Sequence, residues 1–146
     1  MAQMAVVGPA RTRMFGVALT GAGAFMVVAG AATWAMISRK LADESITVAD
    51  DARWFAGAKV AGPLTAFSQA DIIDHHARGI SGGKTYAELA QDDPVRATMM
   101  NASFLRASLF TSVLSFGVAA MAVGVGALTT ISGRAVLALG KGVRRR

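Results

Sequence analysis

The chain has 146 residues, of which 53% are hydrophobic, only 7% are aromatic and none is cysteine, and its net charge is +6. This length fits one domain at most, and the lack of cysteine excludes disulfides, thiolate metal sites and cysteine nucleophiles. Because the apolar residues gather in two blocks, the composition indicates a membrane protein rather than one globular core.

Charge is distributed unevenly along the chain. All 9 acidic residues lie between the two apolar blocks, whereas basic residues without acids flank the blocks toward the termini. These terminal basic residues are Arg11, Arg13, Arg134, Lys141, Arg144, Arg145 and Arg146. Basic residues beside apolar blocks are typical of contact with anionic lipid headgroups. We therefore expect membrane lipid as a partner, with Arg144, Arg145 and Arg146 at the headgroups, and no nucleic acid.

The first apolar block follows a short tail, residues 1–13, and covers residues 14–38 without a charge. We interpret it as the first transmembrane helix, with Trp34 near the far interface, where amphipathic aromatic rings settle. A secretory signal peptide is the alternative, because two arginines precede the block and Ala29-Gly30-Ala31 resembles a cleavage site. The apolar run continues past this site to Ile37 and exceeds a typical h-region of about 7–15 residues, which favours a retained helix.

The central segment, residues 39–106, is polar but rich in helix signals. The residues from Thr47 predict a short helix through Phe55, and Gly62-Pro63 predicts a second helix over 63–78, closed by Gly79. This second helix has an apolar side and an opposite polar side with Gln69, Asp74 and His76. The apolar side consists of Leu64, Phe67, Ala70, Ile73 and Ala77.

Two further helix starts follow in this segment. Thr85 and Glu88 have the spacing of a capping box, and Asp93-Pro94 combines a capping residue with a proline of the first turn. Gly82-Gly83-Lys84-Thr85 resembles the end of a phosphate-binding loop. That loop needs a glycine at position 78, which is Arg78, and a preceding strand, so we interpret these glycines as a turn before a capped helix.

The second apolar block covers residues 107–133 and would form a helix about 40 Å long, more than the ~30 Å core of a bilayer. We interpret it as the second transmembrane helix, starting outside the membrane near residue 94, with residues 134–146 as a basic tail. The predicted fold is an all-α membrane protein, a hairpin of two transmembrane helices with a helical extracytoplasmic segment between them. The terminal arginines place both termini in the cytoplasm by the positive-inside rule, although Arg39, Lys40 and Arg106 oppose it.

One cluster in the sequence has the chemistry of metal ligands: Asp71, Asp74, His75 and His76. Asp71 and His75 are one helical turn apart and are the weak candidates for a shared cation. Adjacent histidines point about 100° apart on a helix and cannot chelate one ion together. Ion pairs of Asp71 with His75 and of Asp74 with Arg78 explain the spacing more simply, so we expect no metal and no other cofactor.

Small residues recur every four positions in both apolar blocks. Gly16, Thr20 and Ala24 form such a row in the first block, with Gly23 and Gly30 beside it, and the second block has Ala107, Thr111, Ser115 and Ala119. The second block also has an adjoining row, Ser108, Ser112, Ala120 and Gly124. Such rows let helix backbones approach closely, and hydroxyls can bond across the contact. Two rows on one helix leave a surplus face, which predicts a further subunit or a second copy.

The chain contains several distinctive motifs: Ile46-Thr47-Val48, Phe55-Ala56-Gly57, Gly62-Pro63, the stretch 83–89 and the stretch 101–110. These motifs resemble those of a family of small actinobacterial membrane proteins that often carry the label of an aromatic ring-opening dioxygenase subunit. The resemblance covers residues 14–131 and implies a bacterial plasma-membrane protein of two helices. It implies no activity, because such dioxygenases hold iron through two histidines and a carboxylate in an open site, and here both histidines are neighbours.

Taken together, the sequence predicts a non-catalytic accessory or scaffolding subunit that associates with a larger membrane complex or with itself. The alternative is a metal-dependent enzyme or sensor that uses the cluster of Asp71, Asp74, His75 and His76. A third hypothesis is an oligomeric pore lined by Thr111, Ser112 and Ser115, which lacks the charged filter expected of an ion channel.

Overall fold

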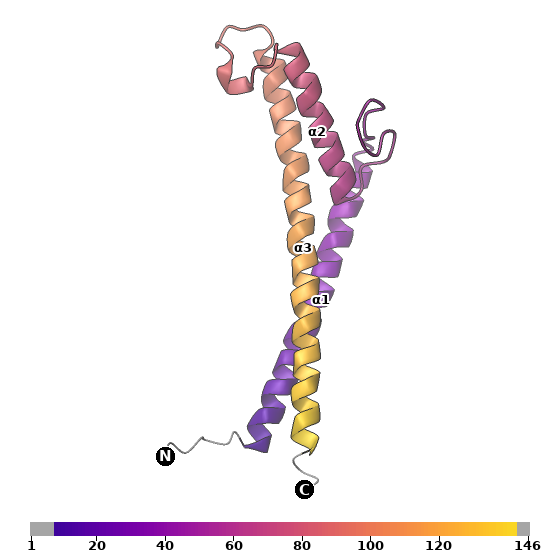
Figure 1. Ribbon diagram of the computed structural model, residues 1–146, viewed down its shortest axis with the longest axis vertical. Coiled ribbons are helices and arrows are strands. Elements are labelled where there is room, and N and C mark those ends of the chain that lie inside the picture. The colour runs from indigo at the N-terminus through magenta and orange to yellow at the C-terminus, as the bar shows by residue number, and fades with distance from the viewer. Residues whose placement is uncertain (1–7, 143–146) are drawn as a thin grey trace. The chain divides into compact units, whose positions relative to one another are not determined.

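The computed structural model describes residues 8–142, and the regular structure in this range is helical (Figure 1). Its elements are α1 (Pro9–Asp43), α2 (Pro63–Ile80), the short 3₁₀ helix η1 (Tyr86–Glu88) and α3 (Arg96–Gly142). Within this range the extended pairing is limited to an isolated bridge between Thr47 and Lys59. The chain is therefore all-α, as the sequence predicts.

Two of these helices, α1 and α3, are long and apolar enough to cross a membrane. Only 17% and 22% of their most apolar stretches are buried inside the chain. The core helix of a soluble protein can be equally long and apolar, but it is mostly buried. The exposure of α1 and α3 leaves apolar surface that water does not favour.

The chain divides into two compact units, and α1 and α3 each contribute to both. Unit 1 contains the chain up to Thr33 and from Val118 onward, and unit 2 is Trp34–Gly117.

In unit 1, α1 and α3 pack against each other in opposite directions through glycines. Gly16 contacts Gly133, Gly23 contacts Gly126, and Gly30 contacts the backbone of Ala119. A Cβ built at Gly23 would lie 2.5 Å from the carbonyl oxygen of Gly126, and one at Gly30 would lie 2.7 Å from that of Ala119. Only residues without a side chain permit this approach of the two backbones.

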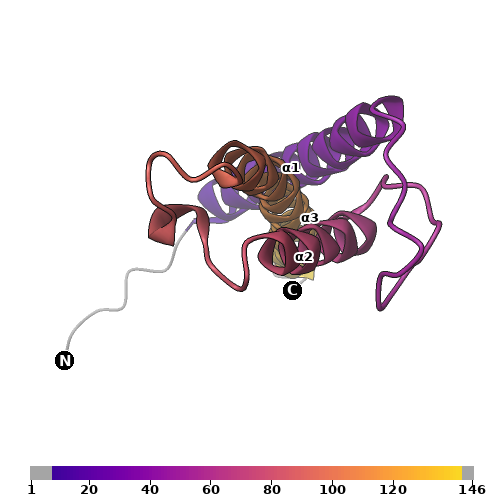
Figure 2. The same cartoon turned by 90° about the horizontal axis from the view of Figure 1, so that it is seen from above.

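Unit 2 combines the end of α1, a loop over residues 44–62, α2, η1 and the beginning of α3. Its core is formed by Leu41, Val48, Val60, Ala66, Ala70, Leu109 and Phe116. Figure 2 shows α2 beside α3, and this packing includes an edge-to-face contact of Phe67 with Phe110, whose ring centroids are 5.8 Å apart. A smaller cluster of Ala77, Leu89 and Met99 closes the end of α2.

The short helix predicted from Thr47 to Phe55 is wrong. The loop instead folds back on itself: the Val48 N–H donates to the Ala58 carbonyl at 2.9 Å, and the Gly57 N–H donates to the Val48 carbonyl at 2.9 Å. This extended backbone buries Val48 and Val60, which are 1% and 0% exposed, against α2 and α3. Burial of two β-branched residues favours the extended conformation over a short isolated helix.

The second predicted helix is confirmed as α2, although it continues to Ile80 and ends at Ser81 rather than at Gly79. Its predicted apolar side is partly wrong, since Leu64 is 65% exposed and Phe67 is 42% exposed. The buried residues are Ala66, Ser68, Ala70, Ile72 and Ala77. Small residues face the core because α2 lies close to the 44–62 loop, whose Trp54 carbonyl accepts a hydrogen bond from Ser68 Oγ at 2.5 Å.

Both later helix starts agree with the sequence. The backbone N–H and hydroxyl of Thr85 donate to Glu88 Oε2 at 2.7 and 2.8 Å, which confirms the capping box at η1. Asp93 Oδ1 accepts from the Val95 N–H at 2.9 Å, and α3 begins at Arg96, near the predicted residue 94. From there α3 is one helix to Gly142, so it extends beyond both ends of the apolar block 107–133.

Candidate functional site

The acid–histidine cluster predicted from the sequence lies on α2, but its members turn to other partners. Asp74 Oδ2 accepts from Arg78 Nε at 2.9 Å, which confirms that predicted pair. The pair of Asp71 with His75 is not observed, because no ion pair joins these exposed residues in the part of the chain that the structure describes. His76 Nε2 lies 2.6 Å from Asp51 Oδ2, on the 44–62 loop.

This arrangement does not assemble a metal centre. The rings of His75 and His76 have centroids 6.2 Å apart and are tilted by 54°, and Nε2 of His76 is already engaged by the Asp51 carboxylate. Among residues 8–142 no three side chains of His, Asp or Glu lie together in a way that could hold an ion. A catalytic metal needs about three protein ligands.

The contact of His76 with Asp51 has a structural role instead. Both side chains are largely exposed, at 48% and 63%. The hydrogen bond from His76 lowers the pKa of Asp51 below its ordinary value of 3.8, with a smaller contribution from the charges of both histidines. The contact thus ties the 44–62 loop to the middle of α2.

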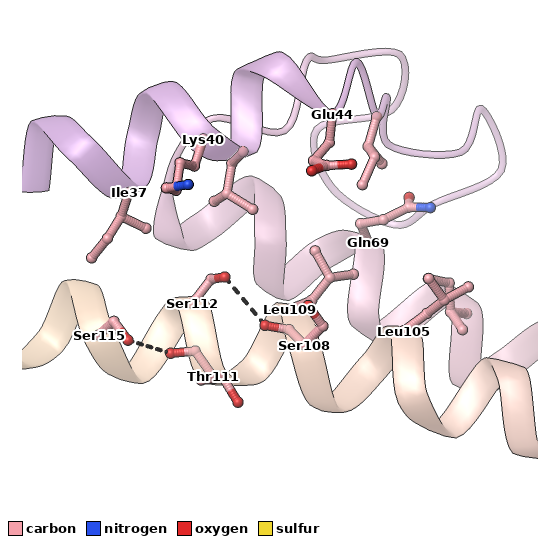
Figure 3. Close-up of a pocket in the computed structure, with 13 residues that line it drawn as sticks. Ile37, Lys40, Glu44, Gln69, Leu105, Ser108, Leu109, Thr111, Ser112 and Ser115 are labelled. Carbon is pink, nitrogen blue, oxygen red and sulfur yellow. Dashed lines mark hydrogen bonds between the residues drawn. The ribbon is translucent and has the colours of Figure 1, made fainter.

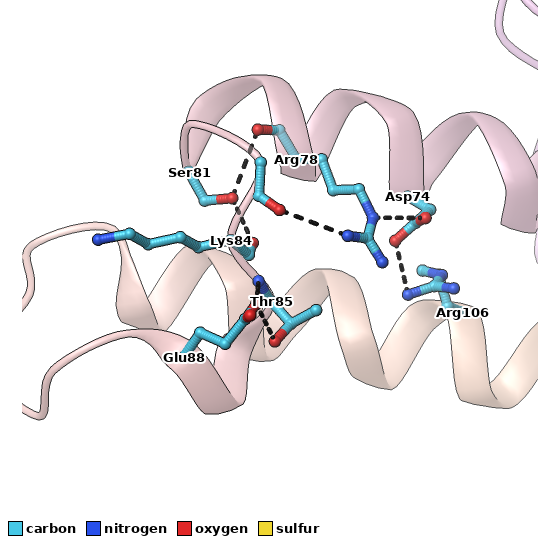
Figure 4. A network of polar contacts seen from close by, with 8 residues as sticks. Asp74, Arg78, Ser81, Lys84, Thr85, Glu88 and Arg106 are labelled. Atoms are coloured by element: carbon cyan, nitrogen blue, oxygen red, sulfur yellow. Dashed lines mark hydrogen bonds and ion pairs between the residues drawn. The ribbon is translucent and has the colours of Figure 1, made fainter.

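Asp74 also joins α2 to α3 through a second cation, Arg106, a pair that was not predicted from the sequence. Figure 4 shows Asp74 between Arg78 and Arg106, and Arg106 Nη1 lies 2.7 Å from Asp74 Oδ1. Arg106 Nε is buried without a hydrogen-bond partner. Arg106 and Asp74 are 32% and 26% exposed, so this pair is more shielded from water than the contact of His76 with Asp51.

The glycine turn that resembles a phosphate loop is confirmed as a turn before a capped helix. It follows α2 rather than a strand, and Gly82 and Gly83 adopt positive φ angles of 64° and 89°. The Ser81 hydroxyl bridges the turn by donating to the Lys84 carbonyl at 2.5 Å. At η1 the N–H and hydroxyl of Thr85 lower the pKa of Glu88, so the capping carboxylate stays ionised.

A groove of about 570 Å³ opens in unit 2 between the end of α1, α2 and α3 (Figure 3). Its walls are mostly apolar, with Ile37 and Leu41 from α1, Ile73 from α2 and Leu109 from α3. Its polar residues are Lys40 and Glu44 on one side, Gln69 on α2, and a row of hydroxyls on α3: Ser108, Thr111, Ser112 and Ser115. This volume and a mostly apolar lining with a few polar groups are typical of small-molecule sites, which are about 300–1,000 Å³.

From the sequence, these hydroxyls could form hydrogen bonds across to another helix. In the structure Thr111, Ser112 and Ser115 donate within α3 instead. Thr111 donates to the Ala107 carbonyl at 2.8 Å, Ser112 to Ser108 at 3.2 Å and Ser115 to Thr111 at 2.8 Å, all within α3. The donor hydrogens of Thr111, Ser112 and Ser115 are therefore used within α3, and these three hydroxyls present acceptor oxygens to the groove. The ionisable residues of its lining are Lys40 and Glu44, and neither His75 nor His76 lines it.

Only some of the predicted helix-packing residues lie in the contact of α1 with α3. Gly16 and Thr20 lie in the contact of α1 with α3, where a Cβ at Gly133 would meet Thr20 Oγ1 at 2.5 Å, and Ala119 is 2% exposed. Ala24 and Thr111 are exposed, and Ser115 lines the groove.

The real contact repeats every seven residues rather than every four: Gly16, Gly23 and Gly30 face Ala119, Gly126 and Gly133. This heptad repeat of small residues is visible in the sequence and was the missed signal. Arg144, Arg145 and Arg146, predicted at lipid headgroups, lie outside the described residues.

Comparison of the chain with protein-family models, with curated protein sequences and with solved structures gave no significant match.

Proposed function

We propose that the chain is a non-catalytic integral protein of a bacterial plasma membrane, in which α1 and α3 cross the bilayer as a hairpin and both termini are cytoplasmic. The length, apolarity and low burial of the two helices support insertion. The cations Arg11, Arg13, Arg134 and Lys141 all lie in unit 1, toward the helix ends nearest the termini, and no acidic residue accompanies them. This distribution supports a cytoplasmic position for those ends.

Packing in unit 2 supports a membrane boundary farther along α3 than the start of its apolar block. The block begins at Ala107, but α2 covers α3 there through Phe67 and Phe110. Trp34 lies edge-on to Phe116, with ring centroids 4.7 Å apart, and Trp is enriched at membrane interfaces. A span of about 20 residues from Phe116 ends close to Arg134. We place the outer interface at Trp34 and Phe116, with the rest of unit 2 outside.

The observation that carries the accessory role is an unpartnered small-residue face on α3. Gly117 and Gly124 repeat the seven-residue spacing of the glycines that contact α1, yet a Cβ at either position would meet nothing within 4 Å. Each is two residues, about 200° around the helix, from Ala119 or Gly126, so this face points away from α1. Met121 and Leu128 on the same side are 63% and 67% exposed. Glycines flanked by large apolar side chains fit a further transmembrane helix.

Cysteine cross-linking tests this association, because the chain has no cysteine of its own. A Gly117→Cys variant oxidised in native membranes should form a disulfide-linked dimer if the partner is a second copy. If the partner is another subunit, native mass spectrometry after mild extraction should show a complex of fixed stoichiometry. Gly124→Leu, also when combined with Gly117→Cys, should abolish either species, and Gly21→Leu, at an equally open glycine of α1, should not. A stable monomer with no co-purifying subunit would overturn the proposal.

Topology is tested with the same cysteine-free background. Ser45→Cys, beyond the end of α1, should react with a membrane-impermeant maleimide on intact cells. Lys141→Cys should react only after the cells are opened. The reverse pattern would refute the orientation, and reaction of both positions in intact cells would refute the hairpin.

A further inference from the structure

A second groove, of about 840 Å³, lies in unit 1 between the first turns of α1 and the last turns of α3. Its lining includes Arg13, Met14, Val17 and Ala18 from α1, and Leu137 and Lys141 from α3. The two helices are close here, since a Cβ at Gly140 would lie 3.7 Å from Thr12 Cγ2. The groove is therefore formed by two helices that lie side by side along it.

Cations and apolar residues are arranged in the same order on both walls of this groove. Val17 lies one turn beyond Arg13 on α1, and Leu137 lies one turn before Lys141 on α3. Because the helices run in opposite directions, both cations lie at one end of the groove and both apolar residues lie deeper. The groove thus has a cationic mouth and an apolar interior.

No acidic residue of the sequence lies before Asp43 or after Asp93, so no acidic side chain of unit 1 neutralises these cations. The apolar wall is also open, with Met14 63% and Val17 56% exposed. A free phosphate would pair with the cations but leave the apolar wall exposed. An alkyl chain alone would cover the wall but leave the cations unpaired. The complementary ligand therefore has an anionic group and an alkyl chain.

We propose that this groove binds one anionic phospholipid of the cytoplasmic leaflet. Its phosphate lies between Arg13 and Lys141, and one acyl chain covers Met14, Val17 and Leu137. The inference rests on the proposed membrane insertion, which places the groove mouth at headgroup depth, where basic pockets between helices bind anionic lipids. It differs from general attraction of a basic tail, because it assigns the lipid to two particular cations and one apolar wall.

The experiment uses the full chain in nanodiscs made from equal amounts of phosphatidylglycerol and phosphatidylcholine. Native mass spectrometry of the released protein should retain one phosphatidylglycerol in preference to phosphatidylcholine. Replacing Arg13 and Lys141 by Gln should reduce this preference by a factor of about five for each cation. The matched control replaces Arg11 and Arg134 by Gln, which removes the same charge from cations that do not line the groove, and should keep the preference.

Two further measurements separate the outcomes. Ala18→Phe should reduce retention of both lipids, because the ring fills the groove, and added inorganic phosphate should not displace the bound lipid. Equal loss of preference in the two charge variants would overturn the inference, since it would show diffuse attraction only. If the inserted protein retains no lipid, the inference fails while the proposed function stands. If the chain does not enter the nanodisc at all, both fail.

Discussion

Replacing Gly23 by alanine tests the central structural claim, the direct backbone contact of α1 with α3. The added Cβ would lie 2.5 Å from the Gly126 carbonyl oxygen, 2.5 Å from Thr130 Oγ1 and 2.6 Å from Thr130 N. Two of these three atoms belong to the backbone, so no side-chain rotation relieves the overlap. The helices must separate by about 1 Å, and overpacking of this kind costs about 1–3 kcal/mol.

A control at Gly21 should change stability in the opposite direction. Gly21 is two residues away on the same helix, and a Cβ there meets nothing within 4 Å. Alanine is favoured over glycine in a helix interior by about 1 kcal/mol, so Gly21→Ala should be neutral or stabilising. Gly16→Ala should be intermediate, because its closest contacts, 2.7 and 2.8 Å, are with the flexible Leu137 side chain.

The measurement is reversible unfolding of the purified variants in mixed micelles, followed by far-UV circular dichroism as the denaturing detergent increases. We expect Gly23→Ala to unfold earlier than the parent and Gly21→Ala to unfold at the same point or later. Equal stability of the two variants would refute the close contact, since both alter helix propensity alike and differ only in what the new methyl group meets.

Three other predictions concern unit 2. Because the hydrogen bond from His76 lowers the pKa of Asp51, it stabilises the folded chain above the ordinary value of 3.8, and this contribution is lost as the pH falls below it. In His76→Ala, the pKa of Asp51 measured by NMR should return toward 3.8, and an unchanged pKa would contradict the contact. Asp74→Ala should destabilise by about 1–3 kcal/mol, because it leaves Arg106 without its partner. Arg106→Met should cost less than about 1 kcal/mol in the same denaturation assay, and the reverse order would be contrary to this reasoning. Phe116→Ala, at a side chain 1% exposed, should cost about 3–5 kcal/mol, whereas a loss below 1 kcal/mol would mean that this ring is not buried.

Elements set by local chemistry could be predicted from the sequence. The uncharged blocks predict the long helices α1 and α3, because length and apolarity are properties of a single segment. The start of α2 at Pro63, the capping box at Thr85 and the start of α3 near Pro94 depend on side chains within a few residues of the backbone groups that they satisfy. The ion pair of Asp74 with Arg78 is likewise local, at one helical turn.

Features that depend on distant segments could not be predicted in the same way. The residues after Thr47 have the spacing of a helix start, but Val48 and Val60 gain burial only if the loop is extended against α2 and α3. The partner of Asp51 is on another element, at His76, and Asp74 finds Arg106 across two helices. Asp71 was expected to pair with His75 on local grounds, and that expectation failed because exposed neighbours gain little from pairing.

The change of packing residues along α3 supports the proposed membrane boundary, and this support does not depend on charge. Between Leu109 and Phe116 its buried positions carry large side chains, whereas from Ala119 to Gly133 they carry Ala and Gly. Burying large apolar groups stabilises contacts in water, but lipid chains are as apolar as leucine, so inside a bilayer that gain disappears and close backbone packing through small residues takes its place. The same change occurs on α1 between Gly30 and Leu41. Each helix therefore changes its packing chemistry beside Trp34 or Phe116, the aromatic pair that we place at the outer interface.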